Sequence, residues 1–242
     1  SNYFMRILII RHGDPDYVHD SLTEKGWREA ELLKNRLIRE PMSAIYCSPL
    51  GRAQATAQPT LTALGRTTET CDWLQEFDGK ITDPRTDLPR GAWDLYPADW
   101  TQSEALYDPA HWIDADPYRD STVPARYHAV CDGLDALLAR HGYVHDGCIF
   151  RVIHENTDTI ALFCHFGVEC VLLSHLLHIS PVALWHGFVA LPTSVTILSS
   201  EEREQGIAYF RCSHFGDLSH LYAGGDPETF AARFCETFTN DT

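Results

Sequence analysis

Near its N-terminus the chain carries four apolar residues, 7–10, that lead directly into Arg11, His12 and Gly13. Such a run is typical of a buried strand, and ligands of open α/β sheets bind beyond the carboxyl ends of the strands. A polar trio at this point is therefore expected in an active crevice. Arginine is a permanently charged anion binder, and glycine permits a sharp turn. Histidine is the side chain that can be neutral and nucleophilic near pH 7.

The same arrangement recurs twice further along the chain. A short apolar strand at residues 44–47 precedes a helix whose first turn contains Arg52, where free backbone N–H groups attract anions. A strand at residues 159–164 ends in His165. Because the tips of parallel strands meet at one edge of a sheet, the polar side chains at these tips are expected to share a crevice. They are Arg11, His12, Arg52 and His165.

Strands and helices alternate along the chain, which predicts an α/β fold: a three-layer α/β/α sandwich around a mostly parallel sheet. Thr23 is a plausible N-cap for the first helix. Residues 148–153 and 159–164 are predicted to be strands joined by a polar hairpin turn. The other expected elements are helices at 24–39, 123–141 and 168–177 and strands at 68–71, 194–199 and 207–211.

The stretch from 79 to 119 has a different composition. Repeated prolines exclude long regular elements, while tryptophans and tyrosines require a packed environment. Acidic residues clearly outnumber basic ones there. We expect one domain over residues 1–242, with 79–119 as an ordered, aromatic and acidic insertion that forms a cap. Its tryptophans are expected mainly in the core of the cap, with one facing the crevice as the less favoured alternative; they are Trp93, Trp100 and Trp112.

The net charge of −15 argues against nucleic acid or anionic membranes as partners. No run of residues is long and apolar enough to span a bilayer, so a cytoplasmic location is predicted. The eight cysteines have no C-x-x-C spacing and are interpreted as free thiols, with Cys148, Cys164 and Cys170 in apolar contexts. An apolar sheet edge would support a homodimer.

Two guanidinium groups and two imidazoles in one crevice form a pocket for a dianionic phosphoryl group. His12 would be the nucleophile, and a carboxyl group of raised pKa would protonate the leaving oxygen. Glu76 follows another strand and is the favoured acid, with Asp78 as the alternative. This chemistry needs no metal or cofactor, and no metal-binding motif is present. His175 and His178, near a helix C-terminus, are interpreted as capping residues rather than ligands.

Five segments together resemble the histidine phosphatase superfamily, which contains the cofactor-dependent phosphoglycerate mutases: 11–13, 22–26, 48–56, 74–76 and 165–167. The resemblance implies a three-layer α/β/α fold and a phosphohistidine intermediate on His12. It implies that Glu76 is the proton donor. The phosphate pocket that it implies consists of Arg11, Arg52 and His165.

The chain departs from the family pattern just after the first motif. The family often has Thr or Ser two residues after the motif glycine, where this chain has Pro15. The acidic insertion should also disfavour a polyanionic cofactor. We therefore expect a metal-independent phosphatase, of the histidine acid phosphatase or mutase-like type, that acts on a small-molecule phosphomonoester. A phosphoglycerate mutase-type phosphotransferase and a non-catalytic module that binds phosphorylated ligands are the alternatives.

Overall fold

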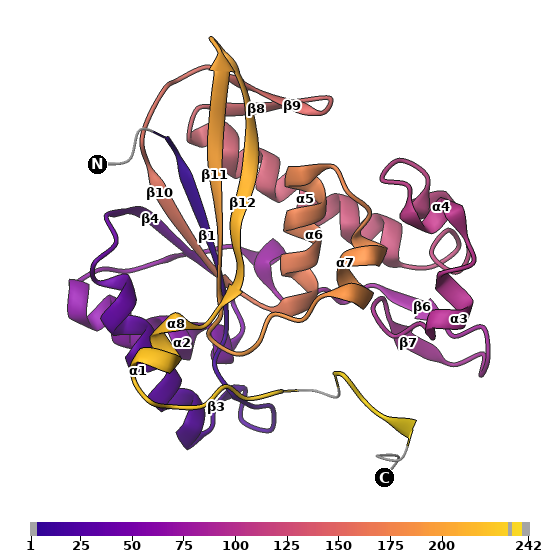
Figure 1. Cartoon of the computed structure of the whole chain (residues 1–242), viewed down its shortest axis with the longest axis horizontal. Helices are drawn as coiled ribbons and strands as arrows, with labels where there is room; N and C mark the ends of the chain where they lie inside the picture. The colour runs from indigo at the N-terminus through magenta and orange to yellow at the C-terminus, as the bar shows by residue number, and fades with distance from the viewer. Residues whose placement is uncertain (1–3, 232–233, 239–242) are drawn as a thin grey trace.

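The computed structural model describes residues 4–231 and 234–238. Its centre is an eight-stranded sheet of order β5-β4-β10-β1-β11-β12-β9-β8 (Figure 1). Strands β5, β4, β10 and β1 are parallel, and the other four extend the sheet with antiparallel pairing. The strands of this sheet are β1 (Arg6–Arg11), β4 (Met42–Cys47), β5 (Glu69–Thr70), β8 (Tyr143–Asp146), β9 (Ile149–Val152), β10 (Thr159–Cys164), β11 (Val195–Glu204) and β12 (Ile207–Asp217).

Helices cover both faces of the sheet, which confirms the predicted three-layer α/β/α fold. Successive side chains of a strand point to opposite faces, and the apolar run of β1 fills both. Ile7 and Ile9 pack with α5, α6 and α7, whereas Leu8 and Ile10 pack with α1 and α2. This double burial explains why the run is uninterrupted rather than alternating. The main helices are α1 (Glu24–Leu37), α2 (Gly51–Leu64), α5 (Val123–Arg140), α6 (Phe166–Leu177), α7 (Pro181–Gly187) and α8 (Ser219–Ala223).

The helix boundaries follow from capping residues. The Thr23 side chain accepts a hydrogen bond from the Gly26 N–H at the start of α1, as the sequence predicted. Helix α2 ends at Gly65, whose φ of 62° lies in the left-handed region that glycine adopts without strain. These two residues fix where α1 begins and where α2 ends, on the Leu8 face of the sheet.

The predicted hairpin between residues 148–153 and 159–164 is wrong. Strand β9 pairs with β8 and β12 at one end of the sheet, whereas β10 is central and parallel to β1 and β4. The sequence analysis missed β8, which forms the hairpin with β9 around Gly147 at φ 61°. The physical reason is that β10 is apolar on both faces and therefore suited to the centre of the sheet.

The segment from 80 to 119 is ordered and lies beside α7 (Figure 1). Trp112 is almost fully buried and contacts the rings of Tyr118, Tyr127 and Trp185. This aromatic cluster joins the segment to α5 and α7, as the composition indicated. Its elements are β6 (Lys80–Thr82), β7 (Pro89–Gly91), α3 (Pro97–Trp100), α4 (Glu104–Tyr107) and the 3-10 helix η2 (Trp112–Asp114).

All eight cysteines are free, and five are buried. Cys164 and Cys170 lie in the core as predicted, but Cys148 is exposed because it lies in the β8–β9 hairpin. Among the described residues, no helix is long and apolar enough to cross a membrane.

Candidate active site

His12 follows the last residue of β1 and is almost fully buried. Its Nδ1 atom lies 2.7 Å from the carbonyl oxygen of Gly13. A carbonyl can only accept a hydrogen bond, so Nδ1 carries the proton in the neutral ring and Nε2 has a free lone pair. Burial lowers the pKa of His12 to about 3, and the charges of Arg11 and Arg52 act in the same direction. The ring is therefore neutral at pH 7, as a nucleophile must be.

His165 lies beside His12 because β10 and β1 are parallel neighbours. The two ring centroids are 5.1 Å apart at an interplanar angle of 57°. His165 is fully buried, and its Nε2 lies 2.8 Å from the hydroxyl of Ser48, at the tip of β4. That hydroxyl already accepts the N–H of Leu50, so its single proton is available to His165. This assigns the ring proton of His165 to Nδ1.

The Nδ1 atom of His165 is buried and has no hydrogen-bond partner in the described part of the chain. Burial, together with His12 and the two arginines of the crevice, holds the pKa of His165 well below its usual range. A neutral ring with an unpaired N–H in a cationic crevice is a donor suited to a phosphoryl oxygen. Ser48 is thus a site residue to which the sequence analysis gave no role, although it lies in one of the motifs that resembled the family.

Arg11 and Arg52, the two predicted arginines, each have a guanidinium N–H group without a hydrogen-bond partner among the described residues. Arg11 is buried, and its Nη1 donates to the carbonyl of Ala190 at 2.7 Å. Arg52 donates from Nη1 to Asp20 Oδ1 at 2.8 Å. The Nε atom of each arginine is buried without a partner in the described residues. Buried donors are rarely left unpaired, so these atoms mark a place for an anion.

One expectation about α2 needs correction. The sequence predicts a substrate anion at the N-terminus of this helix, but the carboxylate of Asp20 occupies it. Asp20 accepts hydrogen bonds from the N–H groups of Gly51 at 2.6 Å and Arg52 at 3.3 Å. An internal anion satisfies these N–H groups because the loop after His12 folds back over the start of α2. The anion site is therefore formed mainly by side chains.

Glu76 follows the 3-10 helix η1 (Asp72–Leu74) and reaches the N-terminus of α6. Its Oε1 accepts the N–H groups of Phe77 at 2.7 Å and Val168 at 3.1 Å, and its Oε2 accepts that of Gly167 at 3.3 Å. Burial raises the pKa of Glu76, although these backbone contacts and Arg11 oppose the shift. A carboxyl group of raised pKa next to a guanidinium can donate a proton.

The alternative acid, Asp78, does not reach the crevice. Its carboxylate is half exposed and lies 3.4 Å from the Arg126 guanidinium on α5. Of the two predicted acids, Glu76 is therefore the one that lies near Arg11 and at the start of α6, directly after His165.

Trp93 from the 79–119 segment lies against the same helix start. A Cβ atom on Gly167 would lie 2.3 Å from the Trp93 ring and 2.7 Å from Glu76 Oε1, so only glycine fits there. Trp100 and Trp112 are buried in the core of the segment. The less favoured alternative, that one tryptophan faces the crevice, stays a prediction, and Trp93 is its candidate because it lies against Gly167.

Two other residues near the site escaped sequence analysis. Glu169 is fully buried in the first turn of α6, where burial raises its pKa to about 8 although Arg11 opposes the shift. A single acid in an apolar helix was the signal that could have identified it. Thr193, in the loop before β11, contacts the backbone on either side of the catalytic strand end. It adopts a φ of 62°, and its N–H lies 3.1 Å from the carbonyls of both Arg11 and His12.

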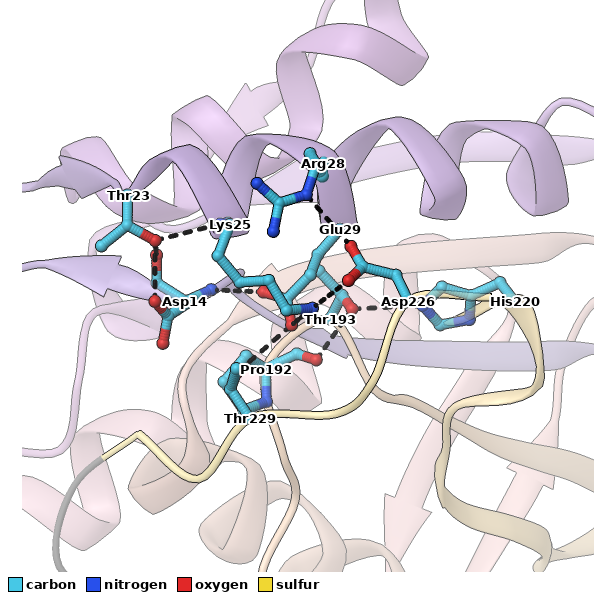
Figure 2. A network of polar contacts seen from close by, with 11 residues as sticks. Asp14, Thr23, Lys25, Arg28, Glu29, Pro192, Thr193, His220, Asp226 and Thr229 are labelled. Carbon is cyan, nitrogen blue, oxygen red and sulfur yellow. Dashed lines mark hydrogen bonds and ion pairs between the residues drawn. The ribbon is translucent and has the colours of Figure 1, made fainter. Parts of the chain in front are cut away.

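The loop after His12 is held by a polar network (Figure 2). The N–H of Asp14 donates to the buried carboxylate of Glu29 on α1 at 2.7 Å. The Thr23 hydroxyl donates to Asp14 Oδ2 at 2.7 Å, and the hydroxyl of Thr229, in the C-terminal segment, reaches Glu29 at 3.2 Å. Three parts of the chain thus fix the peptide that orients His12.

A sequence model of the histidine phosphatase superfamily, branch 1, matches residues 7–212. The chain belongs to this superfamily. It is 25% identical over 234 residues to a probable phosphatase of Schizosaccharomyces pombe, with 90% of this chain and 95% of that protein covered.

Solved structures show the same fold. A phosphoserine phosphatase of Entamoeba histolytica, in complex with phosphoserine, is 19% identical with a TM-score of 0.58, covering 90% of this chain and 99% of its own. A mycobacterial glucosyl-3-phosphoglycerate phosphatase with bound VO3 is 21% identical with a TM-score of 0.54, covering 87% and 98%. These structures confirm the fold that the chain shares with the superfamily.

Proposed function

We propose that this protein is a metal-independent phosphomonoesterase that forms a phosphohistidine on His12. The observation that carries the proposal is the tautomer of His12. Its Nδ1–H is held by the Gly13 carbonyl, which leaves the Nε2 lone pair for attack. The neutral state of the ring follows from its burial beside Arg11.

In the first step, His12 Nε2 forms a bond to phosphorus as the bond to the leaving oxygen breaks. Arg11, Arg52 and His165 donate hydrogen bonds to the equatorial oxygens, where charge must be stabilised during the transfer. Glu76 gives its proton to the leaving oxygen, so the product departs as an alcohol. The step ends with phosphohistidine and an ionised Glu76.

In the second step, water attacks the phosphohistidine. Glu76, now a carboxylate, takes the proton of the water as the new P–O bond forms and the P–N bond breaks. Inorganic phosphate leaves, and His12 and Glu76 return to their starting protonation states. No metal takes part in either step.

The cavity beside Trp93 supports a small polar phosphomonoester as substrate. Trp93, which lies against Gly167, also lines a cavity of about 750 Å³ together with Arg90 and Asp94. We propose that the leaving group occupies this cavity. Phosphoserine and glucosyl-3-phosphoglycerate, which appear in the names of the structural neighbours, belong in the first substrate panel. A cytoplasmic location, a homodimer and a single domain with residues 79–119 as its cap stay predictions.

The test is hydrolysis of p-nitrophenyl phosphate in the presence of EDTA. We expect activity in the wild type and in the control His128→Ala, which removes a histidine of α5 outside the crevice. His12→Ala should be inactive. Rapid acid-free quenching of the wild type should trap a phosphoprotein that is stable to alkali and labile to acid, as a phosphohistidine is, and the His12→Ala variant should give none.

Activity in His12→Ala equal to the wild type would refute the mechanism. If the wild type bound phosphate but hydrolysed no member of the panel, transfer to a phosphoglycerate acceptor would distinguish the mutase from the binding module. The ion pair of Asp20 with Arg52 lowers the positive charge available to a second phosphate group, which favours water as the acceptor.

A further inference from the structure

Three metal-ligand side chains from three elements meet at the far end of α6 from His165. They are Asp135 on α5, His145 on β8 and His175 on α6. Asp135 Oδ1 lies 2.9 Å from His145 Nδ1 and 2.8 Å from His175 Nε2, and the two nitrogens are 3.0 Å apart. One donor atom from each residue therefore faces a common point.

Neighbouring hydrogen bonds determine which nitrogen of His145 carries its proton. The hydroxyl of Tyr209 donates to the carbonyl of Leu177, so its oxygen can only accept from His178 Nδ1 at 3.2 Å. With its proton on Nδ1, a neutral His178 accepts at Nε2 from His145 Nε2, 2.7 Å away. The proton of neutral His145 thus lies on Nε2.

This assignment leaves the Nδ1 lone pair of His145 directed at the carboxylate of Asp135. A lone pair and a carboxylate oxygen 2.9 Å apart repel each other unless a proton or a metal ion lies between them. The cluster is arranged to receive a positive charge.

The geometry suits a tetrahedral transition metal. Zinc binds histidine nitrogen and carboxylate oxygen at about 2.0–2.2 Å, which places neighbouring ligand atoms roughly 3.3 Å apart. The three atoms here need to separate by only a few tenths of an ångström. His145 also stacks on Phe150 with centroids 4.3 Å apart, which fixes its ring plane. His178 Nε2 accepts the hydrogen bond that the second ring nitrogen of a metal-bound histidine usually donates.

We propose that Asp135, His145 and His175 bind Zn²⁺, with a water molecule as the fourth ligand. Side-chain exposures of 35%, 9% and 19% leave an entry path and room for this water. The site joins α5, β8 and α6, and it lies about 15 Å along α6 from His165. It is therefore a structural site, separate from the proposed phosphatase chemistry. His178 is the C-cap residue of α6 as predicted, but its ring orients His145 instead of covering the helix carbonyls.

Isothermal titration with ZnSO₄ after stripping with EDTA tests the proposal. We expect one ion per chain, and at least about 100-fold weaker binding in Asp135→Asn and His175→Ala. His178→Ala, which removes only the partner of His145, should weaken binding about 10-fold. The control His214→Ala, an exposed histidine on β12, should bind like the wild type. Co²⁺ should give the visible absorption of a four-coordinate ion in the wild type and in His214→Ala, but not in Asp135→Asn or His175→Ala.

Thermal unfolding provides a second readout. At 100 times the Kd, Zn²⁺ should raise the Tm of the wild type by roughly 5–10 °C. Asp135→Asn should be folded without metal and show no such increase. Absence of stoichiometric binding, or unchanged binding in Asp135→Asn and His175→Ala, would overturn the proposal; in the second case the ion binds elsewhere, for example at exposed thiols. Hydrolysis of p-nitrophenyl phosphate in EDTA is independent of all these outcomes.

Discussion

Substitution of Ser48 tests whether its hydroxyl places the ring proton of His165 on Nδ1, where it can donate to a phosphoryl oxygen. Its hydroxyl lies 2.8 Å from His165 Nε2 and directs the ring proton to Nδ1, which faces the crevice. In Ser48→Ala this control is lost, and the neutral ring can hold its proton on Nε2 instead. The Nδ1 lone pair then faces the phosphoryl oxygens and no longer donates to them.

A hydrogen bond to a charged group contributes about 1.5–3 kcal/mol. Its loss from the transition state predicts a decrease of roughly 10- to 150-fold in kcat/KM. The assay is p-nitrophenyl phosphate hydrolysis by Ser48→Ala, with Tm measured in parallel because the hydroxyl also accepts the Leu50 N–H. Ser48→Thr, which keeps a hydroxyl, is the matched control and should recover most of the activity. Wild-type kcat/KM in folded Ser48→Ala would refute the assignment of the His165 proton.

Three further changes test other parts of the site. Glu76→Gln should lower kcat about 10²- to 10⁴-fold for alkyl phosphates and less for p-nitrophenyl phosphate, whose leaving group needs no acid; equal losses for both would contradict a proton donor. Asp20→Asn should lower KM, because the carboxylate no longer pairs with Arg52; a raised KM in steady-state assays would count against this. Glu169→Gln should raise Tm more at pH 8 than at pH 5. The pKa of Glu169 is raised to about 8 in the folded state, whereas the unfolded value is about 4.3, so the cost of its ionisation lowers stability increasingly between these two pH values. Equal Tm changes at pH 5 and pH 8 would show that this carboxyl group does not titrate as proposed.

The parts of the fold that could be predicted depend on local signals. The apolar run of β1 and the Thr23 cap are contained in short stretches of sequence, and both are confirmed. Strand tips that carry polar residues gave the histidines and arginines of the crevice, because the parallel order of β4, β10 and β1 brings such tips together.

The remaining features depend on distant parts of the chain. Strand β9 pairs with β8 and β12 rather than with β10, and β8 was not predicted at all. A local sequence pattern does not specify which strands pair. Asp20 lies at the start of α2 only because its loop folds back. Asp135, His145 and His175 have no motif spacing, since each comes from a different element. Exposure of Cys148 follows from the same unpredicted hairpin.

The contact of Trp93 with Gly167 has a consequence for how this protein can diversify. The indole lies against the peptide whose N–H donates to Glu76, so the segment 79–119 and the proposed proton donor contact the same glycine. A chimera that exchanges residues 79–119 for those of a relative changes the position of the acid together with the shape of the pocket. A change in this segment therefore affects substrate selectivity and the reactivity of Glu76 at the same time. A variant designed to change selectivity alone must keep an aromatic ring at position 93.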